Sequence, residues 1–159
     1  MFRRVLKYLL IGVGGIFAVL VGLFAFAYFF PPTYEAATEL PGTNSKVIVR
    51  LRPMHLYLAE YRRALVLRKS GVPDQQFDMF PDTGGYSRTQ LYQLDDGRFV
   101  MRGFFDSVVI DANAHTISTP SAALPENNRY LGAFDDTGDG RWRFIPGSEL
   151  PEQQLKTSN

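Results

Sequence analysis

The chain of 159 residues contains no cysteine. Disulfide bonds, thiolate zinc sites, dithiol redox pairs and a cysteine nucleophile are therefore excluded, as is a lipoprotein anchor on a cysteine. The absence fits an oxidising compartment, where a stray thiol risks wrong pairing, without requiring one. Aromatic residues make up 14% of the chain, so a modest domain can build a core without covalent cross-links.

Acidic residues are missing from the first 34 positions, where Arg3, Arg4 and Lys7 are the only charged residues. The other fourteen basic residues and all sixteen acidic residues follow, so residues 31–159 carry a net charge of about −2. A nucleic-acid-binding domain would show a basic patch or stripe. The balance of charge argues against nucleic acid as a partner, and against a general attraction to anionic lipid.

Residues 9–30 form the one long uncharged hydrophobic stretch. As a helix these 22 residues reach about 33 Å, against a hydrocarbon core of roughly 30 Å. Pro31 and Pro32 end the helix. We expect a single transmembrane helix that contacts the lipid bilayer. The basic N-terminal segment, residues 1–8, predicts that the N-terminus is cytoplasmic. The helix would then cross the inner (plasma) membrane, and residues 31–159 would lie in the periplasm or outside the cell.

A cleaved signal peptide is the alternative to an uncleaved anchor. Ala25 and Ala27 have the spacing of a signal-peptidase site, with cleavage after Ala27. The hydrophobic stretch continues past that site and exceeds the roughly 7–15 residues that are usual for the hydrophobic region of a signal peptide, which favours the anchor.

Small residues recur every four positions along the same helix, at Gly14, Ala18 and Gly22. Such a ridge lets a second helix approach closely, which would support homo-oligomerisation through the membrane. Glycine and alanine are also simply common in membrane helices.

Beyond the helix the pattern predicts a linker at 31–45, a β-rich domain at 46–148 and a flexible tail at 149–159. Asp95-Asp96-Gly97 between alternating runs is a strong hairpin signal. Four predicted hairpins pair 64–68 with 76–80, 88–94 with 98–103, 107–111 with 115–118, and 130–134 with 141–145. We expect a mainly-β domain outside the membrane, an antiparallel β-meander of about eight to ten short strands shaped as a barrel or sandwich.

Residues 53–69 are ambiguous between helix and strand. Met54, Tyr57, Leu58, Tyr61 and Leu65 follow helical spacing, whereas the residues around 65–67 alternate as in a strand. We favour strands.

Two copies of Asp-Thr-Gly, at 82–84 and 136–138, resemble the active-site motif of aspartic proteases. They lie only 54 residues apart, too close for the two lobes that share a proton, and turn chemistry explains both. Residues 135–140 imitate the start of a calcium loop. Position twelve of that loop should be a glutamate and is Pro146 here, which favours a solvated turn.

His55 and His115 are the only histidines and lie 60 residues apart, so a metal site would need carboxylates that the fold brings to them. The sequence therefore predicts no metal and no cofactor. It shows no Ser-containing nucleophile elbow either.

The segment 80–88, FPDTGGYSR, is longer than a minimal hairpin loop requires. Tyr, Arg, Ser and Gly are the ingredients of adaptable binding surfaces, so Asp82, Tyr86, Ser87 and Arg88 are candidate partner-binding residues. Equally, Asp82 could bond its own turn while a glycine takes positive φ.

No catalytic arrangement emerges from these patterns. We expect a non-catalytic interaction or accessory module that docks another membrane or envelope protein, because a tether raises the local concentration of a weak binder. Two alternatives stay open. One is a cell-envelope hydrolase with its site near the 80–88 loop, and the other is a structural spacer.

Overall fold

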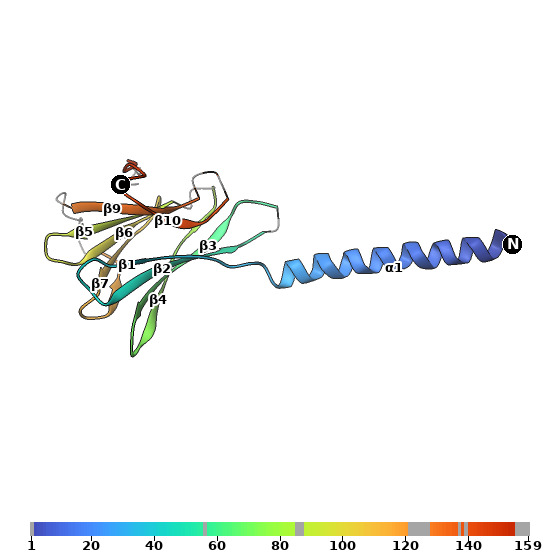
Figure 1. Ribbon diagram of the computed structural model, residues 1–159, viewed down its shortest axis with the longest axis horizontal. Coiled ribbons are helices and arrows are strands. Elements are labelled where there is room, and N and C mark those ends of the chain that lie inside the picture. The colour runs from blue at the N-terminus through green and yellow to red at the C-terminus, as the bar shows by residue number, and fades with distance from the viewer. Residues whose placement is uncertain are drawn as a thin grey trace.

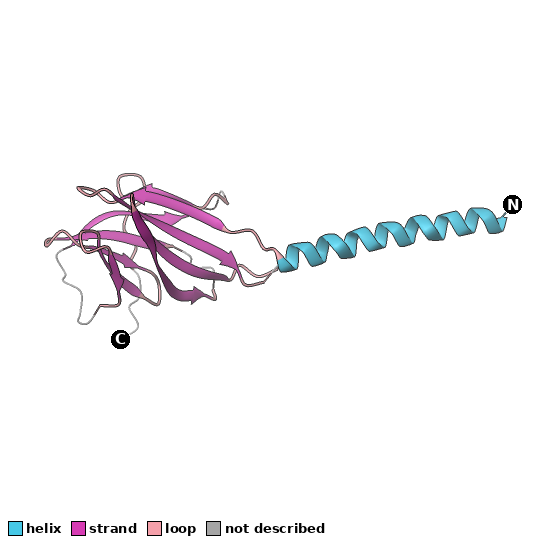
Figure 2. Cartoon of the chain, turned by 90° about the horizontal axis from the view of Figure 1, so that it is seen from below, coloured by secondary structure: helices cyan, strands magenta, loops and turns pink. Residues whose placement is uncertain are grey.

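The computed structural model describes residues 2–55, 57–84, 88–120, 128–136, 138 and 140–154. A long helix projects from a β-sandwich (Figures 1 and 2). The helix, α1, spans Phe2–Phe29, so the basic residues continue the helix that we predicted for 9–30. Its part Lys7–Phe29 is long and apolar enough to cross a membrane, and none of that part is buried against the sandwich.

Within the described ranges ten strands form two antiparallel sheets, which confirms the predicted mainly-β class with one N-terminal helix. The four-stranded sheet has the order β1-β2-β3-β4 and the six-stranded sheet the order β10-β9-β5-β6-β7-β8. The strands are β1 Tyr34–Glu39, β2 Ser45–Pro53, β3 Tyr61–Lys69, β4 Val72–Asp82, β5 Thr89–Leu94, β6 Phe99–Arg102, β7 Ser107–Asp111, β8 Thr116–Ser118, β9 Asn128–Asp135 and β10 Arg143–Pro146.

Local turn chemistry produces the four predicted hairpins, and all four are present. Gly97 takes φ +84° between β5 and β6, and Gly71 takes φ +78° between β3 and β4. Between β7 and β8 the Asp111 carboxylate accepts backbone N–H bonds from Asn113 and Ala114. The hairpin β9–β10 then adds to β5 rather than to β8, so the sheet is not one continuous meander.

The predicted linker differs in the structure, whereas the strand favoured within 53–69 is present. Residues 34–39 are not linker but strand β1, paired along its whole length with β2, because Ala36 and Leu40 are buried in the core. Residues 53–69 contain no described helix: β2 ends at Pro53 and β3 begins at Tyr61. The predicted tail is described through residue 154, and Glu152 and Gln153 hydrogen-bond the six-stranded sheet.

The core lies between the two sheets, where alternate residues of each sheet point inward. Val47, Val49, Leu65 and Leu67 from one sheet meet Phe99, Met101, Ile110 and Phe134 from the other, among further buried side chains. Trp142, the single tryptophan, joins the layers: its indole N–H donates to Val49 O at 3.2 Å and its ring stacks on Phe134. At the sheet edges β1 lies against β10 and β4 against β8.

Register fixes which loops face the helix. Tyr34 at the start of β1 pairs with Leu51 near the end of β2, so the β2–β3 loop, residues 54–60, lies at the end of the sandwich where α1 enters. Figures 1 and 2 show this loop beside the end of the helix. The β3–β4 turn at Ser70 and Gly71 lies at the opposite end.

Candidate functional site

Of the four predicted partner-binding residues of the 80–88 loop, the structure describes Asp82 and Arg88. Asp82 is only 2% exposed, and its carboxylate accepts the backbone N–H of Gly84 at 3.0 Å. This contact matches the alternative in which Asp82 bonds its own turn. Tyr86 and Ser87 lie outside the described residues.

Arg88 contacts other parts of the chain. Its guanidinium donates to Pro151 O, to Gln90 Oε1 at 3.2 Å and to the Tyr130 hydroxyl at 3.4 Å. It also lies 3.7 Å from the Asp135 carboxylate. Arg88 therefore holds the C-terminal segment, residues 149–154, against the six-stranded sheet.

The C-terminal segment crosses the outer face of this sheet. Gln90, which is fully buried, exchanges two hydrogen bonds with the backbone of Gln153, at 2.9 and 2.7 Å. The Tyr92 hydroxyl donates to Glu152 Oε1 at 2.9 Å and accepts from Gln90 Nε2 at 2.9 Å. These bonds explain why β5 is buried on both faces.

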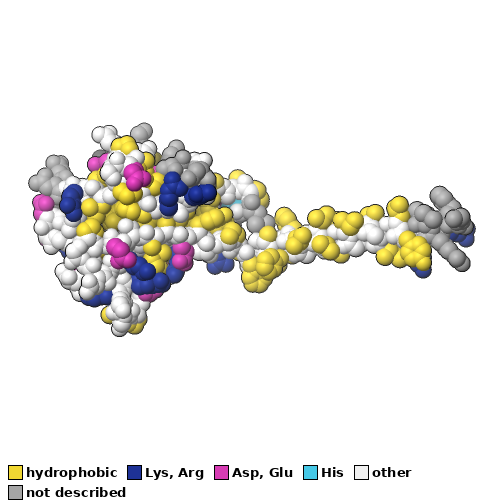
Figure 3. Space-filling model, viewed as in Figure 1, with side chains coloured by type: hydrophobic (Ala, Val, Ile, Leu, Met, Phe, Trp, Pro, Cys, Tyr) yellow, Lys and Arg dark blue, Asp and Glu magenta, His cyan; other side chains and the backbone are white. Residues whose placement is uncertain are grey.

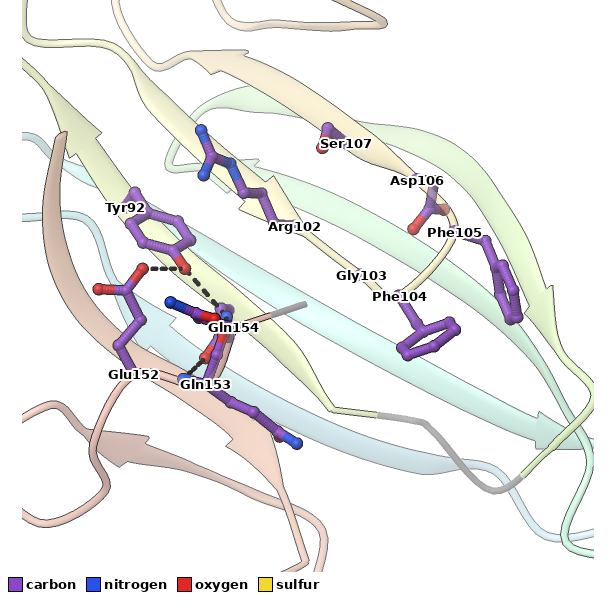
Figure 4. Close-up of a pocket in the computed structure, with 11 residues that line it drawn as sticks. Tyr92, Arg102, Gly103, Phe104, Phe105, Asp106, Ser107, Glu152, Gln153 and Gln154 are labelled. Atoms are coloured by element: carbon purple, nitrogen blue, oxygen red, sulfur yellow. Dashed lines mark hydrogen bonds between the residues drawn. The ribbon is translucent and has the colours of Figure 1, made fainter. Parts of the chain in front are cut away.

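A groove of about 440 Å³ opens between the C-terminal segment and the β6–β7 turn. Figure 4 shows Glu152, Gln153 and Gln154 on one side, and Phe104 and Phe105 in the turn on the other. Arg102 of β6 lies on the groove floor, with its guanidinium carbon 4.9 Å from the centre of the Tyr92 ring. We call this hollow the Arg102 groove.

The lining of the groove carries charges of both signs: Arg102 is basic, and Asp106 and Glu152 are acidic. In the described part of the chain, no ion pair joins Arg102 to a carboxylate, and its contact is the face of the Tyr92 ring. Burial, together with the hydrogen bond to Glu152, raises the pKa of Tyr92 well above its ordinary value. Tyr92 therefore stays neutral at neutral pH and donates to Glu152, while the guanidinium of Arg102 lies over its ring.

Sequence reasoning missed this groove. Its floor is built from ordinary alternating residues of β5 and β6, and its wall comes from a tail some fifty residues later in the chain. The one local signal of an exposed apolar surface is the pair Phe104-Phe105 followed by Asp106, because two consecutive aromatic residues in a turn are seldom both buried. Phe105 is indeed 45% exposed.

The histidines lie apart from the groove. His55 Nε2 is 3.2 Å from Glu60 Oε2 in the β2–β3 loop, and His115 Nε2 contacts Pro73 O at 2.9 Å. No cluster of three potential metal-ligating side chains occurs among the described residues.

The small-residue ridge runs along the exposed surface of α1. Gly14, Ala18 and Gly22 are all exposed, and added Cβ atoms at Gly14 and Gly22 would meet nothing within 4 Å. The ridge is open to a second helix, and association through it stays a prediction.

The fold and the groove define a class of protein: one long apolar helix joined to a two-sheet antiparallel β-sandwich. Comparisons with protein-family models, with curated proteins and with solved structures find no match to this chain.

Proposed function

We propose that this is a single-pass membrane protein whose β-sandwich is a non-catalytic docking module for another membrane or envelope protein. Its N-terminus is cytoplasmic and the sandwich lies on the extracytoplasmic side, the periplasm in a Gram-negative cell. The helix remains uncleaved as the anchor. Supporting this topology, α1 continues past Ala27 to Phe29, and Arg3, Arg4 and Lys7 are its only charged residues.

The observation that carries the docking role is the Arg102 groove. It offers a guanidinium with no carboxylate partner among the described residues, an exposed aromatic ring at Phe105 and the polar wall of the C-terminal segment. Interfaces use this combination, in which Arg and aromatic residues anchor a partner and polar groups form the rim. The guest is an acidic peptide segment. Its carboxylate binds Arg102, and a neighbouring apolar side chain packs against Phe104 and Phe105.

Site-specific photo-crosslinking in cells tests this role. A benzophenone amino acid at Ser107, which lines the groove, should give a discrete adduct with one protein. Arg102→Ala should abolish this adduct. Arg98→Ala, which removes an exposed arginine at the β5–β6 turn, should leave it intact. Absence of an adduct, or an adduct indifferent to Arg102→Ala, would reject the docking role.

Asp82 and Arg88 are poor sites for such a test. Asp82 is buried in its own turn, and Arg88 holds the C-terminal segment that forms the groove wall. Substituting either residue changes the fold around the groove as well as any contact with a partner.

Topology has its own test, because the chain offers no native thiol. A single cysteine at Ser70, in the exposed β3–β4 turn, should react with a membrane-impermeant maleimide in intact spheroplasts. The intact mass of the purified protein should include residues 1–27. Protection of the thiol would reverse the orientation, and loss of those residues would establish cleavage.

A hydrolase site has one observation in its favour, at the helix end and not near the 80–88 loop where we predicted it. His55 lies 3.2 Å from Glu60, as a catalytic base beside an orienting carboxylate would, and it lines a hollow near the helix end. Tyr28, Pro31, Arg52, Pro53, Met54 and Arg62 complete the described lining, and none of these is a serine or threonine. Hydrolysis of nitrophenyl esters that His55→Asn abolishes would support the alternative, and activity unchanged in that variant would remove it.

A further inference from the structure

The surface of the sandwich that faces the end of α1 combines exposed apolar side chains with two arginines. Met54, Tyr57 and Leu58 in the β2–β3 loop are 37%, 83% and 48% exposed. Arg52 and Arg62 flank this loop and are both exposed. We call these five residues the junction surface.

Chain connectivity places the junction surface at the bilayer. Only four residues, 30–33, connect α1, which ends at Phe29, to β1, which begins at Tyr34, and at full extension they span about 14 Å. Since Tyr34 pairs with Leu51, the loop that follows β2 lies at the same height above the membrane. One hollow is lined jointly by Tyr28 and Pro31 at the helix end and by Arg52, Met54 and Arg62. Figure 3 shows hydrophobic side chains where the sandwich meets the helix, with basic side chains next to them.

The two arginines are unusual in their placement. Arg52 and Arg62 are directly opposite each other in the β2–β3 ladder, on the outer face of the sheet. Like charges directly opposite are destabilising unless an anion lies between them. No ion pair joins either arginine to a carboxylate within the described ranges, although Arg50 on the same face pairs with Glu35.

From these observations we infer that the junction surface is a lipid-contact site. Arg52 and Arg62 bind the phosphate of an anionic phospholipid headgroup, and Met54, Tyr57 and Leu58 enter the interfacial layer beside it. Guanidinium groups match phosphate geometry, and a tyrosine with an apolar body and a polar tip suits the membrane interface. The net negative charge of the domain does not oppose this contact. Arg52 and Arg62 lie within a few ångströms of the phosphate, whereas charges farther away than the Debye length of about 8 Å are screened.

This inference rests on the proposed anchoring by α1, and the fixed contact would hold the sandwich in one orientation on the membrane. Two attachments, a helix and a surface, remove most of the rotational freedom that a four-residue connection allows. The Arg102 groove, on the outer face of the other sheet, would then face a constant direction along the membrane.

The test uses the full chain in nanodiscs that contain phosphatidylcholine alone or with phosphatidylglycerol. Single cysteines at Thr33, Tyr57 or Ser70 carry an environment-sensitive fluorophore, and lipids with a spin label near the headgroup quench it. We expect strong quenching at position 33 next to the helix, quenching at position 57 that increases with phosphatidylglycerol, and none at position 70 on the far end. Millimolar glycerol phosphate in solution should not reproduce the effect of the anionic lipid.

Arginine variants separate the site from general charge. Arg52→Gln/Arg62→Gln should lower the ratio of bound to free loop in anionic nanodiscs by about 30-fold, as expected for two arginines near an anionic surface. Arg98→Gln/Arg129→Gln, which removes the same charge from the far end, should leave that ratio unchanged. Quenching at 33 without quenching at 57 would overturn the lipid contact while the anchor stands. Loss of quenching at both positions would overturn the anchor and the contact together.

Discussion

Arg63 of β3 and Asp106 of the β6–β7 turn form an ion pair that ties one sheet to the other, with Nη2 and Oδ1 2.6 Å apart. The arginine side chain is 2% exposed and the aspartate 16%. Arg63 also donates to Phe80 O at 2.9 Å and to the Thr89 hydroxyl at 3.2 Å, and Asp106 Oδ2 accepts the Phe80 N–H at 2.6 Å. This polar network links the two sheets at the helix-side end of the sandwich.

Asp106→Ala should destabilise the sandwich by about 3–5 kcal/mol, because the buried guanidinium of Arg63 loses its counter-charge. Urea unfolding followed by Trp142 fluorescence measures this loss, since Trp142 contacts both sheets.

The double variant Arg63→Met/Asp106→Leu should lose less stability than Asp106→Ala. Asp74→Ala, which breaks the exposed pair with Arg68, is the matched control and should leave the unfolding midpoint unchanged. Equal effects of Asp74→Ala and Asp106→Ala would contradict the role of the buried pair.

Gly132→Ala should separate β9 from β10. Gly132 takes φ +148°, and a Cβ there would lie 2.3 Å from the backbone oxygen of Ile145. A residue with a side chain in this region of backbone space costs of order 1–3 kcal/mol before the clash is counted. Gly97→Ala, at φ +84° in open space, is the control and should cost only about 1–2 kcal/mol. A thermal unfolding series that ranks Gly97→Ala as the more damaging change would refute this account.

Gln90→Ala should release the C-terminal segment from the sheet. Gln90 is fully buried and supplies both hydrogen bonds to Gln153, each worth about 1 kcal/mol net. The amide of Gln153 should then exchange its hydrogen roughly 30-fold faster, as measured by mass spectrometry or NMR. Gln93→Ala, which removes a side-chain contact with the exposed Arg129, is the control. Unchanged exchange at residue 153 would mean that other contacts hold the segment.

The hairpins could be predicted from the sequence because their cause is local. Asp95-Asp96-Gly97 between alternating runs needs no information from the rest of the chain to form a turn. The strand β1 was obscured by the prolines and small polar residues around it, although the alternation of Tyr34, Ala36 and Thr38 with Leu40 was a signal of strand.

Long-range contacts could not be predicted in the same way. The sequence does not indicate that β9 pairs with β5. It also does not indicate which of the several arginines in β2 and β3 points inward, and in the structure the buried one is Arg63. The candidate site shows the same limit. The Arg102 groove exists only because residues 152–154, polar and without periodicity, fold back on β5. Within the 80–88 loop, composition suggested a binding surface, whereas Asp82 and Arg88 make internal contacts.

Stability should fall at alkaline pH through Tyr92. Burial, and secondarily the hydrogen bond to Glu152, raises the folded-state pKa of Tyr92 above its ordinary value of 10.0. Above pH 10 the unfolded chain therefore releases this proton while the folded protein keeps it. The stabilisation is fully present below pH 10 and is lost as pH rises toward the folded-state pKa.

Urea unfolding between pH 9 and pH 11 measures how steeply the free energy of unfolding declines with pH. Tyr92→Phe should show a shallower decline than the wild type, and Glu152→Gln an intermediate one, since the carboxylate contributes to the shift. Identical slopes in all three proteins would show that Tyr92 ionises as readily in the fold as in the unfolded chain.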